Sequence, residues 1–522
     1  MIRNKVFATD VFDESDLYII REKGIKTVVC NENRVKKLSD DIQVFNAEIY
    51  RIEGTWKAYD FINSIIDKLW ESHKNKFIIK SIDLRPVASK WIYWTNFRIG
   101  ALYACIGKHY PEADITWKQS FEAKSKLKEL VKYVKIYIEN SIRAIRSKKH
   151  EVHLVVNGSP RIGILVNNDF EVIQYKYILN YLKDENIILF HYGNIDLQQD
   201  CVNQANIQLI DISKISYHAP QRFLWPFFLN KTTLWMSNIL YQNWHSISSE
   251  IVRYEFIKTT GIKKILINVG ENIPLRNLMK PVFGDEVQVI NTMNGLKSGE
   301  AHDADINFDK WLVWDNEMKD LLVKDCHINS NSLIVTGHLS EDHIRHHRFD
   351  NIMGLDINHL KNKKIITVFS VRGNRKEKVD AFHLLYEMLN ENNDWCIIIK
   401  PHPLEKKSDY ILPEHNNPNV IFVDEKWKNS KSALYDLLHL SDLSLVFGST
   451  VALECSWIKT PCITFEYKSV SFIHIVNNEY IQHIDTIDLL RRQLSDLKKC
   501  EKSIDLINST SVSNTIATIL KN

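Results

Sequence analysis

The sequence predicts an α/β protein with two tandem doubly wound domains, and three observations carry that prediction. From about residue 151 onward, short runs rich in apolar and β-branched residues alternate with helical stretches. Continuous apolar strands separated by helices are typical of a parallel sheet that is covered on both faces. A polar, basic connection near residues 341–364 divides the runs into two series. At about 150 residues per domain, the 522-residue chain has room for three or four domains.

Two series of strands define the two domains, which we place at residues 151–350 and 351–522. The strands expected in the first domain are 162–166, 187–190, 207–210, 265–269, 287–290, 311–314 and 333–335. Those expected in the second domain are 365–369, 396–399, 420–423, 443–447 and 462–465, with helices near 377–390 and 431–440 and from about 450. Ligands of such sheets bind at the carboxyl ends of the strands, so a cleft between the two domains is where we expect a site.

Two further segments precede these domains. Residues 1–117 mix short apolar runs such as Thr27-Val28-Val29 with helical patterns, which indicates an N-terminal α/β extension. The segment 118–150 is basic, and residues 118–149 predict one long helix because apolar residues recur at steps of three and four. That helix carries ten positive and three negative residues, a net charge of +7. It is either a solvated spacer packed by its apolar stripe or a helix that lies on anionic lipid.

Composition and charge argue against several classes of protein. The 67 Lys and Arg residues nearly balance the 64 Asp and Glu residues, which argues against a chain-wide nucleic-acid footprint. The eight cysteines include no C-x-x-C spacing, and scattered thiols fit a reducing compartment. We find neither a secretory leader nor a run of about 18 uncharged apolar residues. We therefore expect a cytoplasmic protein without a nucleic-acid partner, peripheral on the inner face of the membrane if helix 118–149 binds lipid.

Two groups of residues have the composition of metal ligands. Asp303-Ala304-Asp305 spells D-x-D, but the surrounding pattern favours a loop with two exposed carboxylates. His338, His343, His346 and His347 lack a zinc spacing with a carboxylate partner and are typical of a solvated interdomain linker. We therefore expect neither a bound metal nor a cofactor.

The first chemical motif follows the strand 396–399. Lys400-Pro401-His402-Pro403 places a histidine between two prolines, which restrict the backbone on both sides. We expect the imidazole of His402 at the mouth of the cleft, with Lys400 beside it. Such a pair suits a diphosphate or a phosphate ester, because charge-assisted hydrogen bonds to phosphate oxygens are strong.

A second motif follows the strand 443–447. Gly448 permits a tight turn, and Ser449 and Thr450 precede a helix that begins Val451-Ala452-Leu453-Glu454. Two hydroxyls and the first N–H groups of a helix form an anion site, although the same residues are also typical of an ordinary N-cap. Glu454 is either a ligand of ribose hydroxyls or a surface charge. Arg372, in the loop 371–376, either closes over phosphate or belongs to a solvated turn.

The two motifs together resemble a known group of enzymes. Lys400-Pro401-His402-Pro403 and Phe447-Gly448-Ser449-Thr450-Val451-Ala452-Leu453-Glu454 are similar to the His-Pro and Ser-Ser/Thr motifs of bacterial sialyltransferases and polysialyltransferases. The same region is similar to capsule-type Kdo transferases and, more distantly, to CDP-glycerol glycerophosphotransferases. The resemblance covers roughly residues 151–522 and is specific only between about 365 and 466.

This resemblance implies a GT-B fold of two Rossmann-like domains, a cytidine-nucleotide donor and transfer without a metal. Residues 151–350 then form the acceptor-side domain and residues 351–522 the donor-binding domain. The resemblance implies that His402 contacts the donor phosphate and assists the leaving group, and that Ser449 and Thr450 bind the same phosphate. The predicted donor-binding residues are Lys400, His402, Pro403, Gly448, Ser449, Thr450, Glu454 and Arg372.

The catalytic base is expected in the acceptor-side domain, since an inverting transfer needs a group that takes the acceptor proton. The related enzymes have an acidic pair or a histidine before a glycine. This chain has Asn294-Gly295 instead, and an asparagine does not act as a base near neutral pH. We therefore consider Glu300, His302 and Asp303 as equal candidates, with Glu271 behind them.

The predicted function is that of a metal-independent, inverting glycosyltransferase of bacterial surface polysaccharide, such as capsule or lipopolysaccharide. It would transfer a sialic-acid-like nonulosonic acid or Kdo from a CMP-linked nucleotide sugar to a glycan or glycolipid acceptor. A CDP-glycerol-type phosphotransferase and a sugar-nucleotide epimerase are alternative enzymes of the same fold. A catalytically inactive scaffold of a glycan assembly complex is a further alternative, which Asn294 in place of the base supports.

Overall fold

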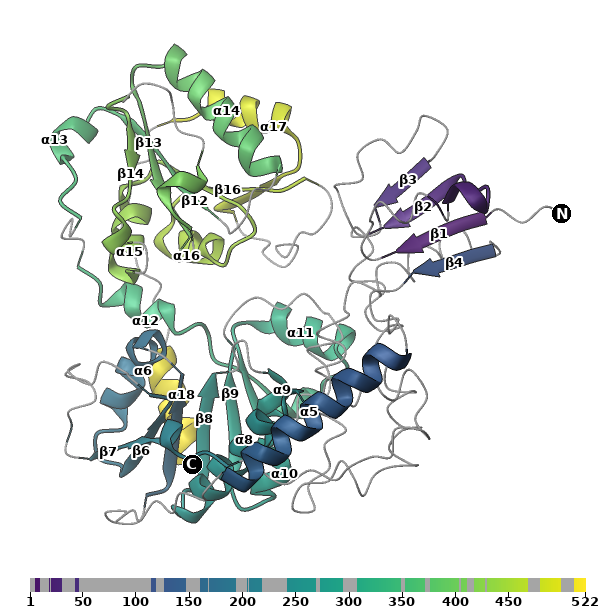
Figure 1. Ribbon diagram of the computed structural model, residues 1–522. Helices are drawn as coiled ribbons and strands as arrows, with labels where there is room; N and C mark the ends of the chain where they lie inside the picture. Colours follow the sequence, from purple (N-terminus) through teal and green to yellow (C-terminus); the bar gives the residue numbers. More distant parts are fainter. Residues whose placement is uncertain are drawn as a thin grey trace. The chain divides into compact units, whose positions relative to one another are not determined.

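The computed structural model divides the chain into two compact units, Met1–Thr336 with Ile516–Asn522, and Gly337–Thr515 (Figure 1). The chain passes from the first unit into the second and returns to the first with its last residues. The structure describes residues 5–9, 18, 20–30, 43–46, 114–118, 126–146, 160–167, 169–193, 204, 206–217, 242–268, 273–293, 308–348, 353–370, 376–402, 405–410, 417–427, 430–467, 479–498 and 511–522.

The described part of the first unit contains a seven-stranded sheet in the order β11-β10-β9-β8-β5-β6-β7, with all neighbours parallel. The chain enters this sheet at its inner strand β5, continues with β6 and β7 on one side of β5, and then places β8 to β11 on the other side. This reversal between β5 and β8 is the position at which doubly wound sheets bind ligands. The strands are β5 (Ile162–Val166), β6 (Ile187–His191), β7 (Ile207–Asp211), β8 (Lys264–Asn268), β9 (Gln288–Thr292), β10 (Lys310–Val313) and β11 (Leu333–Val335).

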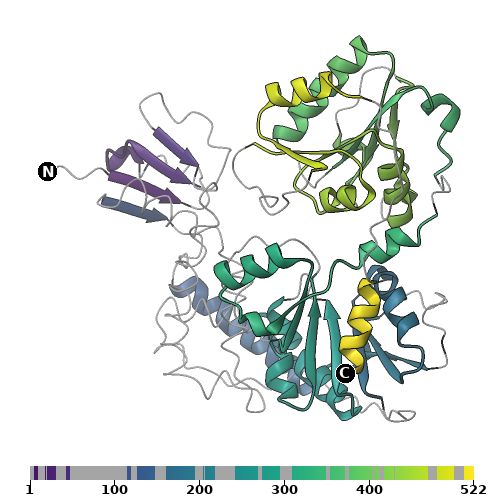
Figure 2. The same ribbon diagram turned by 180° about the vertical axis from the view of Figure 1, so that it is seen from behind.

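Helices cover this sheet, and every residue of its strands β5 and β6 is buried. The helical segments are α6 (Asp169–Tyr181), η3 (Ile212–Lys214), α8 (Trp244–Thr259), α9 (Ile273–Arg276), α10 (Met279–Phe283), α11 (Asn316–Asp325) and η6 (Ser330–Ser332). The C-terminal helix α18 (Val512–Lys521) ends in this unit, where the Ile519 carbonyl accepts a hydrogen bond of 2.9 Å from Lys264 Nζ. Figure 2 shows α18, in yellow, beside the sheet of this unit.

The predicted N-terminal extension contains, among its described residues, a four-stranded parallel sheet in the order β3-β2-β1-β4. The strands are β1 (Lys5–Thr9), β2 (Thr27–Cys30), β3 (Gln43–Asn46) and β4 (Asp114–Lys118). Lys118 pairs with Thr9 at the end of β4, so the helix expected from residue 118 cannot begin there. The structure has helix α5 at Lys126–Arg146, and residues 119–125 and 147–149 lie outside the described part.

The described part of the second unit repeats the arrangement with a six-stranded parallel sheet in the order β14-β13-β12-β15-β16-β17. Here the reversal lies between β12 and β15. The strands are β12 (Lys364–Phe369), β13 (Trp395–Lys400), β14 (Val420–Phe422), β15 (Leu443–Val446), β16 (Cys462–Phe465) and β17 (Ile481–Ile484). The helical segments are α12 (Ser340–Arg345), α13 (Ile357–Leu360), α14 (Lys376–Glu391), η7 (Lys407–Asp409), η8 (Glu425–Trp427), α15 (Lys431–Leu440), α16 (Val451–Ile458) and α17 (Ile487–Ser495).

These two sheets confirm the predicted α/β class with two Rossmann-like domains. Each strand expected from the sequence corresponds to one observed strand, from β5 to β16. One face of the second sheet packs against α14 and α17 through buried residues such as Ile399, Phe382 and Leu490. Since successive side chains of a strand point to opposite faces, Lys400 points to the other face of β13.

The segment between the predicted domains is not the solvated linker expected from its histidines. Imidazole Nε2 of His347 lies 2.8 Å from Asp436 Oδ1 on α15, and the two side chains are only 9% and 5% exposed. His338 stacks on Trp457 of α16 with ring centroids 5.0 Å apart. The fully buried Asp342 on α12 accepts hydrogen bonds from Ser511 Oγ and Ser513 N. The segment after Thr336 therefore packs as part of the second unit, ahead of the predicted boundary at residue 350.

No helix in the described part of the chain combines the length and the apolar character needed to cross a membrane.

Candidate functional site

Three adjacent strands of the second sheet end together at its reversal. Phe369 of β12 pairs with Lys400 of β13 on one side and with Val446 of β15 on the other. The residues that follow these strands therefore lie at one edge. This register brings together the predicted residues Lys400, His402, Gly448, Ser449 and Thr450, whereas Pro403 and Arg372 lie outside the described residues.

A buried carboxylate, that of Glu405, holds the loop that carries His402. Its Oε2 accepts hydrogen bonds from the His402 backbone N at 3.3 Å, from Ser370 Oγ at 3.0 Å and from Tyr410 Oη at 2.5 Å. Its Oε1 accepts from Lys378 Nζ at 2.7 Å. The Glu405 backbone N in turn donates to the His402 carbonyl at 2.9 Å. The backbone of His402 is thus fixed by both its N–H and its carbonyl, while its side chain is only half-buried.

The charge of this anchor is stable at neutral pH. Burial alone would raise the pKa of Glu405, but hydrogen bonds from Lys378, Tyr410 and Ser370 and the positive charge of Lys378 outweigh it and hold that pKa below its ordinary value. Burial and the neighbouring Glu405 raise the pKa of Tyr410, so its hydroxyl remains a donor. Lys378 Nζ also lies 4.3 Å from the centroid of the Tyr410 ring, a cation–π contact.

The sequence analysis did not find this anchor. Glu405 follows His402 by three residues, which is a local signal that could have suggested it. Lys378 and Tyr410 gave no such signal, because a lysine early in a helix and a tyrosine in a loop are usually solvated. Their side chains meet Glu405 only because β12 and β13 place helix α14 and the loop after β13 side by side.

The turn after β15 leads directly into helix α16. Gly448 has a φ of 59°, a left-handed conformation that glycine adopts without strain. Val451 N lies 3.4 Å from Ser449 Oγ, and the N–H groups of Ala452 and Leu453 donate to the carbonyls of Ser449 and Thr450. Thr450 occupies the N-cap position but its side chain makes no capping hydrogen bond. Of the two hydroxyls, only that of Ser449 therefore caps the helix.

Glu454, the predicted ribose ligand, is not a surface charge. It lies in the first turns of α16 and is 2% exposed. The alternative that it is a solvated helix residue is therefore wrong, and its role toward a ribose stays a prediction.

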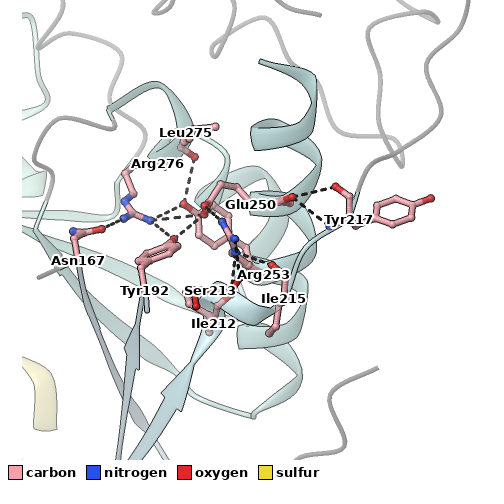
Figure 3. Close-up of polar contacts among 12 residues, drawn as sticks. Asn167, Tyr192, Ile212, Ser213, Ile215, Tyr217, Glu250, Arg253, Leu275 and Arg276 are labelled. Atoms are coloured by element: carbon pink, nitrogen blue, oxygen red, sulfur yellow. Dashed lines mark hydrogen bonds and ion pairs between the residues drawn. The ribbon is translucent and has the colours of Figure 1, made fainter. Parts of the chain in front are cut away.

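The corresponding edge of the first sheet holds a dense network around a buried arginine, Arg276 at the end of α9 (Figure 3). Its guanidinium donates to Tyr192 Oη at 2.8 Å, to Tyr254 Oη at 2.9 Å and to Asn167 Oδ1. Asn167 follows β5, so the network reaches the strand at which the sheet reverses. Arg276 is 3% exposed, and Glu250 lies 3.9 Å away as an ion-pair partner.

Glu250 links this arginine to a second one. Its Oε1 pairs with Arg253 at 2.6 Å and its Oε2 accepts from Tyr192 Oη at 2.8 Å. Arg253 Nε also donates to the carbonyls of Ile212 and Ile215, which lie in and after the turn that follows β7. Figure 3 shows these side chains converging between the strand ends and helix α8. The network thus ties the segments after β5, β6 and β7 to α8 and α9.

Burial and charge keep this network in one protonation state. Burial raises the pKa of Tyr192 to about 12 against the opposing effect of Arg276. Burial alone would lower the pKa of Arg276, but Tyr192, Tyr254 and Glu250 hold it well above its ordinary value. At neutral pH the neutral hydroxyls of Tyr192 and Tyr254 therefore accept hydrogen bonds from a charged Arg276.

The sequence analysis also missed this network. Its members come from five separate segments, and Arg276 and Asn167 are 109 residues apart. The only local signal was the spacing of Glu250 and Arg253, which suits an ion pair on one helix face.

The predicted base residues are not placed by the structure. Glu300, His302 and Asp303 lie outside the described residues, as do Asn294, Glu271 and Asp305. Within the described ranges, no group of three or more His, Cys, Asp or Glu residues is arranged to hold a metal ion.

Comparison with known proteins gives fold-level similarities only. No family model matches the sequence, and no curated protein matches it. Among solved structures, the wall teichoic acid polymerase TagF is 13% identical with a TM-score of 0.43, over 76% of this chain and 97% of that one. The S. aureus MnaA–UDP complex is 14% identical with a TM-score of 0.47, over 69% and 97%. The UDP-GlcNAc 2-epimerase of Methanocaldococcus jannaschii is 15% identical with a TM-score of 0.45, over 69% and 99%.

These similarities are too low to define a family. The class of the protein, an α/β chain with two doubly wound domains, rests on its own two sheets. Its function is inferred from the residues at their strand ends.

Proposed function

We propose that the chain is a glycosyltransferase that takes its sugar from a nucleotide-linked donor and works without a metal. The donor phosphate binds at the carboxyl edge of β13, β12 and β15. One observation supports this most strongly: the Lys400-Pro401-His402 and Gly448-Ser449-Thr450 segments follow the two strands that flank β12, at the reversal of the second sheet. Reversals of this kind are where doubly wound sheets bind nucleotides.

The proposed chemistry is stabilisation of the leaving group. As the bond between sugar and phosphate breaks, negative charge develops on the phosphate oxygens. The imidazole N–H of His402 and the hydroxyls of Ser449 and Thr450 donate hydrogen bonds to those oxygens, and the N-terminus of α16 adds a favourable dipole. The removal of one such donor typically lowers the rate by about 10²–10³.

The Glu405 anchor supports this role for His402. A side chain that binds a transition state gains most when its position is fixed before the reaction. The Glu405 carboxylate accepts from the His402 N–H and the Glu405 N–H donates to the His402 carbonyl, so the backbone is fixed while the residue stays half-exposed.

The finer assignment comes from the sequence resemblance. We propose a CMP-linked nonulosonic acid or Kdo as donor, and a glycan or glycolipid of a bacterial surface polysaccharide as acceptor. The acceptor proton goes to Glu300, His302 or Asp303. A second candidate is a nucleotide-binding scaffold without transfer activity, and the presence of Asn294 at the place of the expected base favours it.

The test is equilibrium binding of CMP, CDP, UDP and GDP by calorimetry, followed by a sugar-transfer assay with CMP-sugars and CDP-glycerol. The variants are His402→Ala and the matched control His383→Ala, since His383 is an exposed histidine on α14 of the same unit. We expect cytidine nucleotides to bind the wild type and the control but not His402→Ala. Cytidine-nucleotide binding without transfer would favour the scaffold, and equal binding by a folded His402→Ala protein would overturn the proposed site.

A further inference from the structure

Helix α5 has one covered face, and its opposite face is apolar but exposed. Tyr133, Ile136 and Asn140 are buried, with 0%, 8% and 4% of their surface exposed. Five further apolar residues remain exposed, by 37% to 86%. They are Val131, Val134, Ile138, Ile142 and Ile145, which we call the α5 stripe.

The α5 stripe is continuous along the helix. Its members follow one another at steps of three, four, four and three residues, so they form a single row. Among the described residues, the other exposed large apolar side chains are scattered over α6, α13, α17, β11 and the N-terminal segment. Single exposed apolar residues are ordinary, whereas a contiguous exposed row marks an interaction surface.

Positive charges flank the stripe. Lys132, Lys135 and Arg143 are exposed and lie on the side of the helix between the stripe and the buried face. The acidic residue described beside them is Glu139, which lies 4.0 Å from Lys135 in a solvated pair. Residues 126–146 contain six positive and two negative side chains, a net charge of +4.

An exposed apolar row with positive charges beside it fits one kind of partner best. A nucleic acid would be attracted by the charges but would leave the isoleucine and valine row in water. An anionic bilayer satisfies both features, since its acyl boundary takes apolar side chains and its phosphates take lysine and arginine. The helix of 21 residues is about 30 Å long, and its charges suit a position in the plane of the interface.

We propose that α5 lies in the surface of an anionic membrane, with the α5 stripe inserted at the headgroup boundary and Lys132, Lys135 and Arg143 on the lipid phosphates. This surface belongs to the first unit and does not depend on the proposed donor site of the second. It brings the chain to the place where a glycolipid acceptor is found.

The test is flotation of the full chain with phosphatidylcholine vesicles that do or do not contain phosphatidylglycerol. We expect binding only to the anionic vesicles, and weaker binding at high salt. In Ile138→Ser/Ile142→Ser, the loss of two inserted side chains should weaken binding by about tenfold per residue. In Lys132→Gln/Lys135→Gln, the loss should be about fivefold per charge.

The matched controls are Ile173→Ser on α6 and Leu489→Ser on α17, which are 39% and 43% exposed and do not belong to the α5 stripe. All six substitutions in these four variants are at exposed sites, so the proteins should fold alike. The controls should bind vesicles as the wild type does.

Three results would overturn the proposal. The first is that the wild type does not bind anionic vesicles. The second is that Ile138→Ser/Ile142→Ser binds them as well as the controls do. The third is that this variant is a monomer where the wild type is a dimer, while its binding to vesicles is unchanged. The last result would assign the stripe to a second copy of the chain. Nucleotide binding is measured separately in solution, so failure here leaves the proposed donor site untouched.

Discussion

The two doubly wound sheets share one topology but use the edge at their reversal in different ways. In the first unit, the described residues at this edge are locked by Arg276, Glu250, Arg253 and Tyr192, all of them engaged with one another. In the second unit, the buried charges of Glu405 and Lys378 hold the backbone, while the side chains of His402, Ser449 and Thr450 stay half-exposed. Buried charges at the strand ends therefore have two different effects. In the first unit they hold the side chains of the edge in place, and in the second unit they hold the backbone while other side chains stay accessible.

The largest expected effect is in the first unit. Arg276→Met should lower the free energy of unfolding by about 3–5 kcal/mol, because Tyr192, Tyr254 and Asn167 lose their shared donor and the buried Glu250 loses one of its positive neighbours. Chemical denaturation would measure it, with Arg161→Met as the control, since Arg161 is exposed in the same unit. A loss no greater than that of the control would show that the network does not stabilise the edge.

The second effect tests the anchor of His402. Glu405→Gln should cost about 3 kcal/mol, because Lys378 is then buried without a counter-charge. It should also weaken nucleotide binding, since the His402 loop loses its anchor. The control is Glu387→Gln on the same helix as Lys378, where the solvent-exposed pair with Arg491 should contribute little to stability. Unchanged nucleotide affinity in Glu405→Gln would show that the contacts of Glu405 do not contribute to nucleotide binding.

The same anchor predicts a pH dependence. The pKa of Glu405 is lowered in the folded protein, so its stabilising contribution is present above the ordinary value of 4.5 and is lost as the pH falls through the lower folded value. The difference in unfolding free energy between wild type and Glu405→Gln should therefore be full near neutral pH and shrink in acid. A difference that stays constant or grows on acidification would contradict an ionised Glu405.

The smallest expected effect concerns the turn before α16. Gly448→Ala forces an alanine into a left-handed conformation, which costs about 1–2 kcal/mol and displaces the Ser449 and Thr450 hydroxyls. Gly354→Ala is the matched control, because Gly354 has a φ of 66° in the same unit with open space around it. The two variants should lose similar stability, but only Gly448→Ala should lose nucleotide affinity, by about tenfold. Equal affinity in both would exclude the turn from the site.

Local sequence predicted the strands of the two large sheets well, whereas the roles of the donor-side motifs stay predictions. Continuous apolar runs located β5 to β16, and β16 spans the predicted residues 462–465. The strand β17 was missed because its sequence Ile-Gln-His-Ile has two exposed polar residues in the middle. The start of α5 was misplaced because a strand, β4, occupies the residues before it. The segments around His402 and Gly448 stood out in the sequence because proline restricts the backbone and glycine permits a left-handed turn.

The buried networks were beyond the reach of local sequence. Lys378 and Glu405 are 27 residues apart, and Arg276 and Tyr192 are 84 apart. From its local sequence alone, each of these residues would be predicted to be a solvated polar side chain. Their partners are decided by which strand ends and helices the two sheets bring together, and periodicity carries no information on that.

The most direct test of the account is amide hydrogen exchange of the wild type with and without CMP. The proposed donor site predicts slower exchange for peptides that contain residues 402–405 and 448–453, and no change in peptides around residues 166–167 and 192–193 of the first unit. Protection confined to the first unit's edge, or absent from both edges at a CMP concentration that saturates binding, would contradict a donor site in the second unit.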